Sequence, residues 1–283
     1  MINLNRIAMV VFPHSKINIG LYVTDRRGDG YHNIETLFYP LGLSDVLEAV
    51  VNPVDPHGRP EFAVSGMEIE GPVESNLVLK ACWLLEKRAG LTGLMIHLHK
   101  CIPMGAGLGG GSSDGAFMLL LLNRLLNAGL TPGELHDLAL ELGSDCPFFM
   151  VTGPRFARGR GEELTPAPVS LKGLHLQLYH PGTGISTALA YRNVQVGPPD
   201  RPIEELASLP MEKWRDSLRN VFEPYAFEQL PVLAQIRDEL YRHGSIYTSM
   251  TGSGSAMYGL FESEKEAPPS IARYLVWKEE LRH

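Results

Sequence analysis

Short hydrophobic runs, separated by turn-forming residues, dominate the first fifty positions of the chain. Val, Ile, Leu, Phe and Tyr fill these runs, and Gly, Pro and Asp stand between them. Runs of this kind are typical of β-strands. They predict four strands, over residues 7–12, 17–23, 36–41 and 45–51.

The spacing of the apolar residues changes twice between positions 76 and 100. Over residues 76–89, Leu77, Ala81 and Leu85 recur on one helix face, so this segment predicts a helix. Over residues 94–100, Leu and Ile alternate with Met and His. That alternation predicts a strand with one exposed face.

Two helices are predicted to follow. Residues 114–128 are rich in Ala, Leu, Met and Phe, and Ser112 or Ser113 is the expected N-cap. Next, the segment Thr-Pro-Gly-Glu at 131–134 predicts a capping box, in a helix that Gly143 ends. Because strands come first and helices afterwards, the predicted fold class is α+β rather than a doubly wound parallel sheet.

The second half of the chain begins its own set of strands and helices. We expect a domain boundary near Gly153, with an N-terminal domain of residues 1–153 and a C-terminal domain of residues 154–283. A Pro-rich linker is expected around residues 198–202. The remaining predicted elements are a strand over 174–180, helices near 211–219 and 231–243, and a hairpin of 246–250 and 256–261 around the loop 251–255.

Composition narrows the class of protein. The 283 residues suffice for one large or two modest domains, and a hydrophobic content of 44% is ordinary for a globular protein. The net charge of −7 argues against a general nucleic-acid binder. Three scattered cysteines suit reduced thiols. Without a membrane-length apolar run or a secretory signal, we expect a cytoplasmic protein that has no membrane partner.

A glycine-rich loop at residues 103–114 carries the clearest chemical signal. Five of the seven residues from Gly105 to Gly111 are glycine, and a helix is predicted to follow directly. Glycines let consecutive N–H groups converge on one anion, and a helix N-terminus attracts negative charge. The loop therefore predicts a phosphate site, whereas a plain strand-to-helix turn needs only one or two glycines.

The type of phosphate loop follows from its neighbours. No lysine follows the glycines, which excludes a Walker A loop. A literal G-x-G-x-x-G occurs at Gly105, Gly107 and Gly110, but the half-exposed strand before it and the second helix after it do not suit a dinucleotide-binding fold. With Pro103 before the glycines and two serines after them, the loop resembles that of galactokinase, homoserine kinase and mevalonate kinase.

Four other stretches have both a plain and a functional interpretation. Lys16, flanked by apolar residues, is either a surface lysine or the partner of an anion. The turn that ends in Tyr31 and His32 is either ordinary turn chemistry or a recognition element. Asp145 is either an N-cap or Asx turn, or a carboxylate held for proton transfer. The loop 251–255 is either a hairpin turn or a place of close approach.

Taken in this order, the motifs resemble the 4-diphosphocytidyl-2-C-methylerythritol kinase family, within the galactokinase, homoserine kinase and mevalonate kinase superfamily. The resemblance spans roughly the whole chain, and departures such as Gly20, Gly115 and Cys146 remove no chemical group that the mechanism needs. The matching stretches are residues 15–18, 27–32, 36–38, 76–77, 103–114, 143–147 and 251–255.

The resemblance implies a two-domain α+β kinase that transfers the γ-phosphoryl group of ATP to the 2-hydroxyl of the cytidine-diphosphate-linked methylerythritol, with Mg²⁺. It implies that Asp145 takes the hydroxyl proton and that Lys16 holds both Asp145 and the hydroxyl. The implied ATP-binding residues are Asn76, Lys100, Pro103, Gly105, Gly107, Leu108, Gly109, Gly110, Gly111, Ser112 and Ser113. The implied substrate-binding residues are Asn18, Tyr31, His32, Thr187, Tyr191, Gly252 and Ser253.

Two alternatives stay open at this point. Another kinase of the superfamily would lack the Gly-Tyr-His turn, and a non-catalytic nucleotide-binding protein would lack Lys16 or Asp145. The sequence has all of these residues. We expect the partners to be small molecules, with the chain acting as a monomer or a homodimer, and the residues that contact Mg²⁺ are not predicted.

Overall fold

The computed structural model describes residues 8–52, 58–69, 71–89 and 93–283, which form two compact units. The first unit contains the described residues of 1–15, 43–103 and 109–152, and the second contains 16–42, 104–108 and 153–283. The chain thus passes between the units several times, the last time at Gly153. The predicted division into domains 1–153 and 154–283 stays a prediction.

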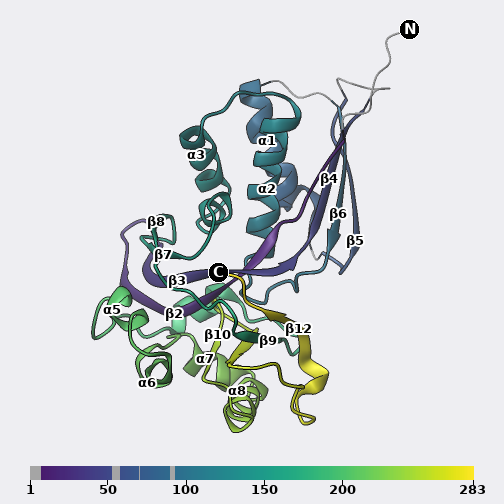
Figure 1. Ribbon diagram of the computed structural model, residues 1–283. Helices are drawn as coiled ribbons and strands as arrows, with labels where there is room; N and C mark the ends of the chain where they lie inside the picture. The colour runs from purple at the N-terminus through teal and green to yellow at the C-terminus, as the bar shows by residue number, and fades with distance from the viewer. Residues whose placement is uncertain (1–7, 53–57, 70, 90–92) are drawn as a thin grey trace. The chain divides into compact units, whose positions relative to one another are not determined.

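The first unit is a four-stranded sheet with helices on one face (Figure 1). Along β6, buried and exposed residues alternate strictly, as the sequence predicted. The sheet order is β1 (Ala8–Val11), β4 (Val46–Val51), β6 (Leu94–Lys100) and β5 (Glu61–Gly66). Only the β5–β6 pair is parallel. The helical elements are η1 (Val73–Ser75), α1 (Leu77–Ala89), α2 (Gly110–Leu125), α3 (Pro132–Leu142) and η2 (Cys146–Met150).

The start of α2 differs from the prediction. Its N-cap is Gly109, whose φ of 74° is in the left-handed region, and no side chain caps the helix. The predicted cap at Ser112 or Ser113 is therefore wrong, because the glycines let the helix begin at Gly110 and place both serines in its first turn. The capping box of α3 is confirmed: Thr131 Oγ1 accepts from Glu134 N–H, and the Glu134 carboxylate accepts from Thr131 N–H.

The second unit contains two four-stranded sheets and several short helices (Figure 1). One sheet has the order β2 (His14–Arg26), β3 (His32–Ser44), β7 (Arg155–Arg158) and β8 (Glu163–Pro166). The other has the order β10 (Tyr247–Met250), β11 (Met257–Phe261), β9 (His175–Tyr179) and β12 (Leu275–Glu280). The helical elements are α4 (Thr187–Asn193), α5 (Ile203–Ala207), η3 (Met211–Lys213), α6 (Trp214–Ser217), α7 (Glu223–Gln229), α8 (Val232–Arg242) and η4 (Ala272–Tyr274).

A buried hydrophobic cluster holds the second unit together. Leu21 and Val23 of β2 pack in one core with Phe222, Ile236 of α8 and Met257 of β11. The predicted hairpin is confirmed as β10 and β11, which pair antiparallel. Among the described residues, none of the helices combines the length and the apolar character needed to cross a membrane.

Candidate active site

The first turn of α2 presents backbone N–H groups that no side chain caps. Gly111 is exposed there, and a Cβ added to it would meet nothing within 4 Å. The Ser113 N–H already bonds to the Gly109 carbonyl at 2.9 Å, which places the start of the helix at Gly110. An uncapped N-terminus with a glycine at its exposed side is suited to bind an anion.

Lys100 anchors this turn from beneath. Its Nζ donates to Asp114 Oδ2 at 2.7 Å and to Asp45 Oδ2, and all three side chains are almost fully buried. A Cβ on Gly110 would lie 3.4 Å from Lys100 Nζ and 3.0 Å from Ile102. The last residue of β6 is thus bound by a buried hydrogen bond to Asp114 of α2, just after the first turn.

Asp45 also fixes the backbone before the glycines. Its Oδ1 accepts from the N–H groups of Cys101 and Ile102, at 2.5 and 2.8 Å. One carboxylate therefore holds both the lysine and the first residues after β6. Burial alone would lower the pKa of Lys100, but Asp114 and Asp45 outweigh it and the pKa is raised. Lys100 is accordingly charged inside the fold.

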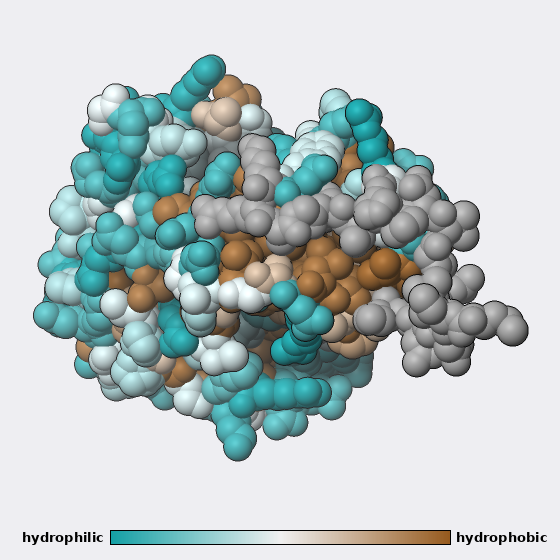
Figure 2. Space-filling view, turned by 90° about the horizontal axis from the view of Figure 1, so that it is seen from above, coloured by the Kyte–Doolittle hydropathy of each residue, from teal (hydrophilic) through white to brown (hydrophobic). Residues whose placement is uncertain are grey.

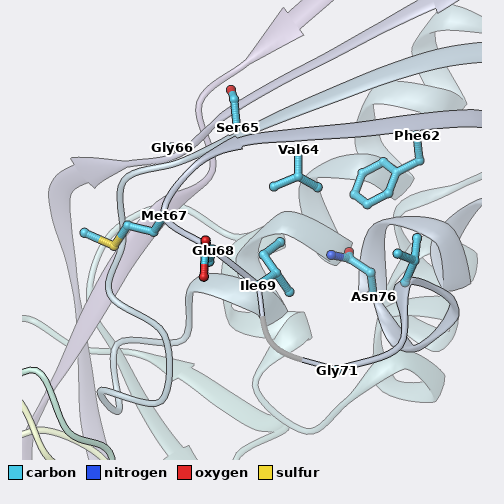
Figure 3. Close-up of a pocket in the computed structure, with 10 residues that line it drawn as sticks. Phe62, Val64, Ser65, Gly66, Met67, Glu68, Ile69, Gly71 and Asn76 are labelled. Atoms are coloured by element: carbon cyan, nitrogen blue, oxygen red, sulfur yellow. The ribbon is translucent and has the colours of Figure 1, made fainter.

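A pocket of about 350 Å³ opens at the edge strand β5 of the same unit (Figure 3). The side chains of Phe62 and Val64 point into it from one side, and Ile69 and Asn76 lie on the opposite side (Figure 3). Asn76 Oδ1 accepts from the Val78 N–H at 2.9 Å, so its carbonyl end is engaged at the start of α1.

The wall of this pocket is joined to β6. The Met67 N–H donates to the Lys100 carbonyl at 3.0 Å, and Gly66 lies so close that a Cβ would be 2.3 Å from that oxygen. The Lys100 backbone thus lies against the pocket wall, and its side chain lies under α2.

Several hydrophobic side chains are exposed on the protein surface. Figure 2 shows one area where such side chains gather on a mostly hydrophilic face. Of the residues that line the pocket, Val64, Met67 and Val73 are exposed large hydrophobic residues.

Asp145 stands directly before η2 in the first unit. It has the N-cap position, but its carboxylate makes no capping hydrogen bond. The four residues that follow are buried, which fixes its backbone. Burial raises the pKa of the neighbouring Cys146 to about 12, so that thiol is not a nucleophile near neutral pH. The plain interpretation of Asp145 as a capping side chain is therefore not supported.

In the second unit, Lys16 is almost completely buried on β2. Its Nζ donates to Asn18 Oδ1 at 2.7 Å and to the Gly107 carbonyl at 3.1 Å, and lies 5.0 Å from the centre of the Phe38 ring. The interpretation of Lys16 as a surface lysine is wrong. Asn18 Oδ1 also accepts from Gly252 N–H at 2.9 Å, so Asn18 connects the lysine with the loop 251–255.

Gly107 and the loop 251–255 approach each other backbone to backbone. A Cβ on Gly107 would lie 2.1 Å from the Thr251 carbonyl oxygen. The Thr251 hydroxyl donates to the Gly107 carbonyl at 3.0 Å and accepts from the Asn18 N–H at 3.1 Å. The close approach that was one interpretation of this loop is confirmed, and Lys16, Asn18, Gly107 and Thr251 form one hydrogen-bonded group.

His32 and Tyr191 form the aromatic part of the second unit's candidate site. Their rings lie 4.9 Å apart, and His32 Nε2 is buried without a hydrogen-bond partner. Tyr191 also packs edge-on against Phe222. Tyr31 is exposed and lies under the Arg160 guanidinium, 4.8 Å from it, a contact that the sequence did not indicate.

The remaining predicted residues fall in the same two groups. Thr187 Oγ1 and Ser253 Oγ are 3.1 Å apart, at the start of α4 and in the loop 251–255. Gly105 and Leu108 belong with Gly107 to the second unit, whereas Pro103 and residues 109–113 belong to the first. Among the described residues, no group of three His, Cys, Asp or Glu side chains is arranged to hold a metal ion.

Comparison with known proteins defines the class. Residues 76–153 match the GHMP kinases N terminal domain, and residues 202–275 match the GHMP kinases C terminal domain. A homoserine kinase from Cytophaga hutchinsonii shares the fold, with a TM-score of 0.68 over 97% of this chain and 90% of its own at 16% identity. The α+β fold predicted from the resemblance is confirmed, and the protein is a kinase that uses ATP.

Closer relatives narrow the family further. The 4-diphosphocytidyl-2-C-methyl-D-erythritol kinase of Bacteroides thetaiotaomicron is 47% identical over 92% of this chain and 94% of its own. The corresponding protein of Cytophaga hutchinsonii is 40% identical over 91% and 94%. A crystal structure of 4-(cytidine 5'-diphospho)-2C-methyl-D-erythritol kinase matches with a TM-score of 0.74 at 37% identity, over 94% of this chain and 92% of that one. The chain therefore belongs to the 4-diphosphocytidyl-2-C-methyl-D-erythritol kinase family of GHMP kinases.

The close approach at Gly107 predicts a large cost for a single methyl group. Gly107→Ala should destabilise the protein by about 1–3 kcal/mol through overpacking, in addition to about 1–2 kcal/mol for a positive φ. Gly182→Ala is the matched control, since Gly182 also has a positive φ (80°) but has nothing within 4 Å of an added Cβ. Urea unfolding of both variants measures the difference, and equal losses would show that the contact with Thr251 does not constrain the loop.

Proposed function

We propose that this enzyme transfers the γ-phosphoryl group of ATP to the 2-hydroxyl of 4-diphosphocytidyl-2-C-methyl-D-erythritol, giving the 2-phosphate and ADP. The reaction belongs to the non-mevalonate route to isopentenyl diphosphate. The names of the relatives support the acceptor. The uncapped N-terminus of α2 is the observation that carries the assignment of the phosphate site. We propose a cytoplasmic enzyme, acting on small molecules as a monomer or homodimer.

ATP is assigned to the first unit. Its phosphates accept from the N–H groups at the start of α2, where Gly110, Gly111 and Ser112 provide the backbone and Ser112 also a hydroxyl. The apolar pocket of Phe62, Val64 and Ile69 takes the adenine ring, since such pockets with a few polar groups are typical of ligand sites. Asn76 lines that pocket and is assigned to contact the nucleoside, whereas the Lys100 backbone supports the pocket wall through its carbonyl.

Phosphoryl transfer is promoted chiefly by positioning and by neutralising charge. Mg²⁺, bound mainly through the ATP phosphates, would supply part of the positive charge. The first turn of α2 contributes the positive end of the helix dipole. In the second unit, Lys16 contributes a full charge whose position is fixed by Asn18 and Gly107.

Asp145 is assigned as the group that removes the proton from the acceptor hydroxyl. It lies directly before η2, whose buried residues from Cys146 to Phe149 hold its backbone in place. Lys16 stabilises the oxygen as negative charge develops on it, a role for which a buried, well-oriented ammonium is suited. Asn18, Thr187, Gly252 and Ser253 hold the acceptor or the groups that bind it.

The cytosine base is assigned to His32 and Tyr191. The His32 Nε2 atom is buried and lacks a partner, which is costly unless a ligand supplies one. Tyr191, whose ring lies beside that of His32, offers a surface for a base, and Tyr31 is an exposed aromatic ring next to His32 in the chain. A hydrogen bond at His32 distinguishes cytosine from uracil, whereas stacking does not.

Gly111→Val tests the phosphate site. The side chain has room in the protein but lies over the N–H donors, so ATP affinity should fall about 10- to 150-fold, the equivalent of losing ~1.5–3 kcal/mol of charged hydrogen bonding. Gly133→Val is the matched control, because Gly133 also lies in a first helical turn with nothing within 4 Å of an added Cβ. Isothermal titration with ATP measures both variants. Normal affinity in a folded Gly111→Val protein would exclude this site.

Asp145→Asn tests the proton transfer. A positioned base contributes about 10²–10⁴-fold to rate, so kcat should fall by that factor while the KM values change much less. Lys16→Ala should lower kcat to a similar extent. Steady-state kinetics measure these effects, with Asp137→Asn on the exposed side of α3 as the control. An Asp145→Asn enzyme with wild-type kcat would remove Asp145 from the mechanism.

Base selectivity tests the acceptor site. We expect the wild type to prefer the cytidine substrate over its uridine analogue, because buried unpaired polar atoms cost ~1–3 kcal/mol each. His32→Ala should remove most of this preference, whereas Tyr191→Ala should lower kcat/KM for both substrates alike. The measurement is kcat/KM for each substrate with each protein. Equal use of both substrates by the wild type would show that His32 does not read the base.

A further inference from the structure

The buried group of Asp45, Lys100 and Asp114 has unequal charges. Two carboxyl groups share one ammonium, and the three side chains are between 0% and 4% exposed. If both acids were ionised, the interior of the first unit would hold one uncompensated negative charge. Burying such a charge is costly, and a carboxyl group normally keeps its proton instead.

The hydrogen bonds indicate which acid keeps the proton. Asp45 accepts from two backbone N–H groups and from Lys100, so its ionised form is stabilised from three sides. Asp114 accepts a hydrogen bond from Lys100 through Oδ2, and its Oδ1 is buried without a hydrogen-bond partner. Both carboxyl groups accept from the same Lys100 Nζ, so the two acids lie around one ammonium group.

We propose that Asp114 keeps a proton at neutral pH and so holds the group electrically neutral behind the first turn of α2. Burial raises the pKa of Asp114 to about 8; Lys100 opposes this rise and Asp45 adds to it. Lys100 at the end of β6 and Asp45 before β4 are the charged groups that act on Asp114 within the described residues. Asp114 is thus a positioning residue, which acts through its charge and through Lys100.

The charge of Asp114 affects the affinity for ATP, if ATP binds at the start of α2 as the proposed function requires. Loss of the proton adds a negative charge beneath the turn that is assigned to the phosphates. ATP should therefore bind less tightly as the pH rises through the pKa of Asp114, and ATP binding should in turn favour the protonated form. Asn is the closest uncharged mimic of protonated Asp, so Asp114→Asn should retain the affinity measured at neutral pH.

The proton itself can be observed without ATP. In a ¹³C NMR titration of the aspartate carboxyl carbons in the full chain, one resonance should titrate near pH 8, far above the usual range for aspartate. That resonance should be absent in Asp114→Asn. It should be present in the control Asp137→Asn, because the Asp137 side chain is exposed on α3. If every carboxyl resonance titrates below about pH 6, Asp114 is ionised and the proposal is wrong.

The effect on the nucleotide is measured by titrating ATP with excess Mg²⁺ between pH 7 and pH 9.5. Wild type and Asp137→Asn should lose affinity by about threefold or more over this range relative to Asp114→Asn. Parallel pH profiles of wild type and Asp114→Asn would show that the proton does not act on ATP. Absence of ATP binding in the wild type at every pH would instead contradict the proposed function, and the NMR result would stand independently.

Discussion

The buried hydrogen bonds from Lys100 to the carboxyl groups of Asp45 and Asp114 are the constraint on which the proposed phosphate site depends. These hydrogen bonds join the end of β6 to Asp114 of α2, and Asp45 binds the backbone that leads into the glycines. A glycine-rich segment has many accessible conformations and loses much entropy on folding. Buried anchors at both of its ends, Asp45 before it and Asp114 after it, restrict it to the one in which α2 begins uncapped.

In the second unit, hydrogen bonds compensate the burial of another lysine. Lys16 would be costly to bury alone, but Asn18 and the Gly107 carbonyl accept its hydrogen bonds. Gly107 and Thr251 approach so closely that neither the segment around Gly107 nor the loop 251–255 can shift without the other. Only glycine fits at position 107, because a Cβ there would overlap the Thr251 carbonyl. The Gly107 carbonyl also holds the Lys16 ammonium, which we assign to the reacting oxygen.

Local sequence patterns correctly predicted the elements that are determined by neighbouring residues in the chain. The alternation in β6, the capping box of α3 and the β10–β11 hairpin each depend on residues close in sequence, and all three were found. The edge strand β5 was missed, because its six residues alternate weakly and its parallel pairing with β6 depends on residues distant in sequence. Without β5 the apolar pocket could not be foreseen. The contacts of Asp45 and Asp114 with Lys100 could not be predicted either, because only the fold brings the three side chains together.

A ³¹P NMR analysis of the reaction of the enzyme with MgATP and 4-diphosphocytidyl-2-C-methyl-D-erythritol tests the proposed transfer directly. We expect one ADP for each acceptor consumed and a new phosphate monoester on the 2-hydroxyl. Release of ADP and inorganic phosphate without a phosphorylated acceptor, or a phosphate on a different hydroxyl, would contradict it.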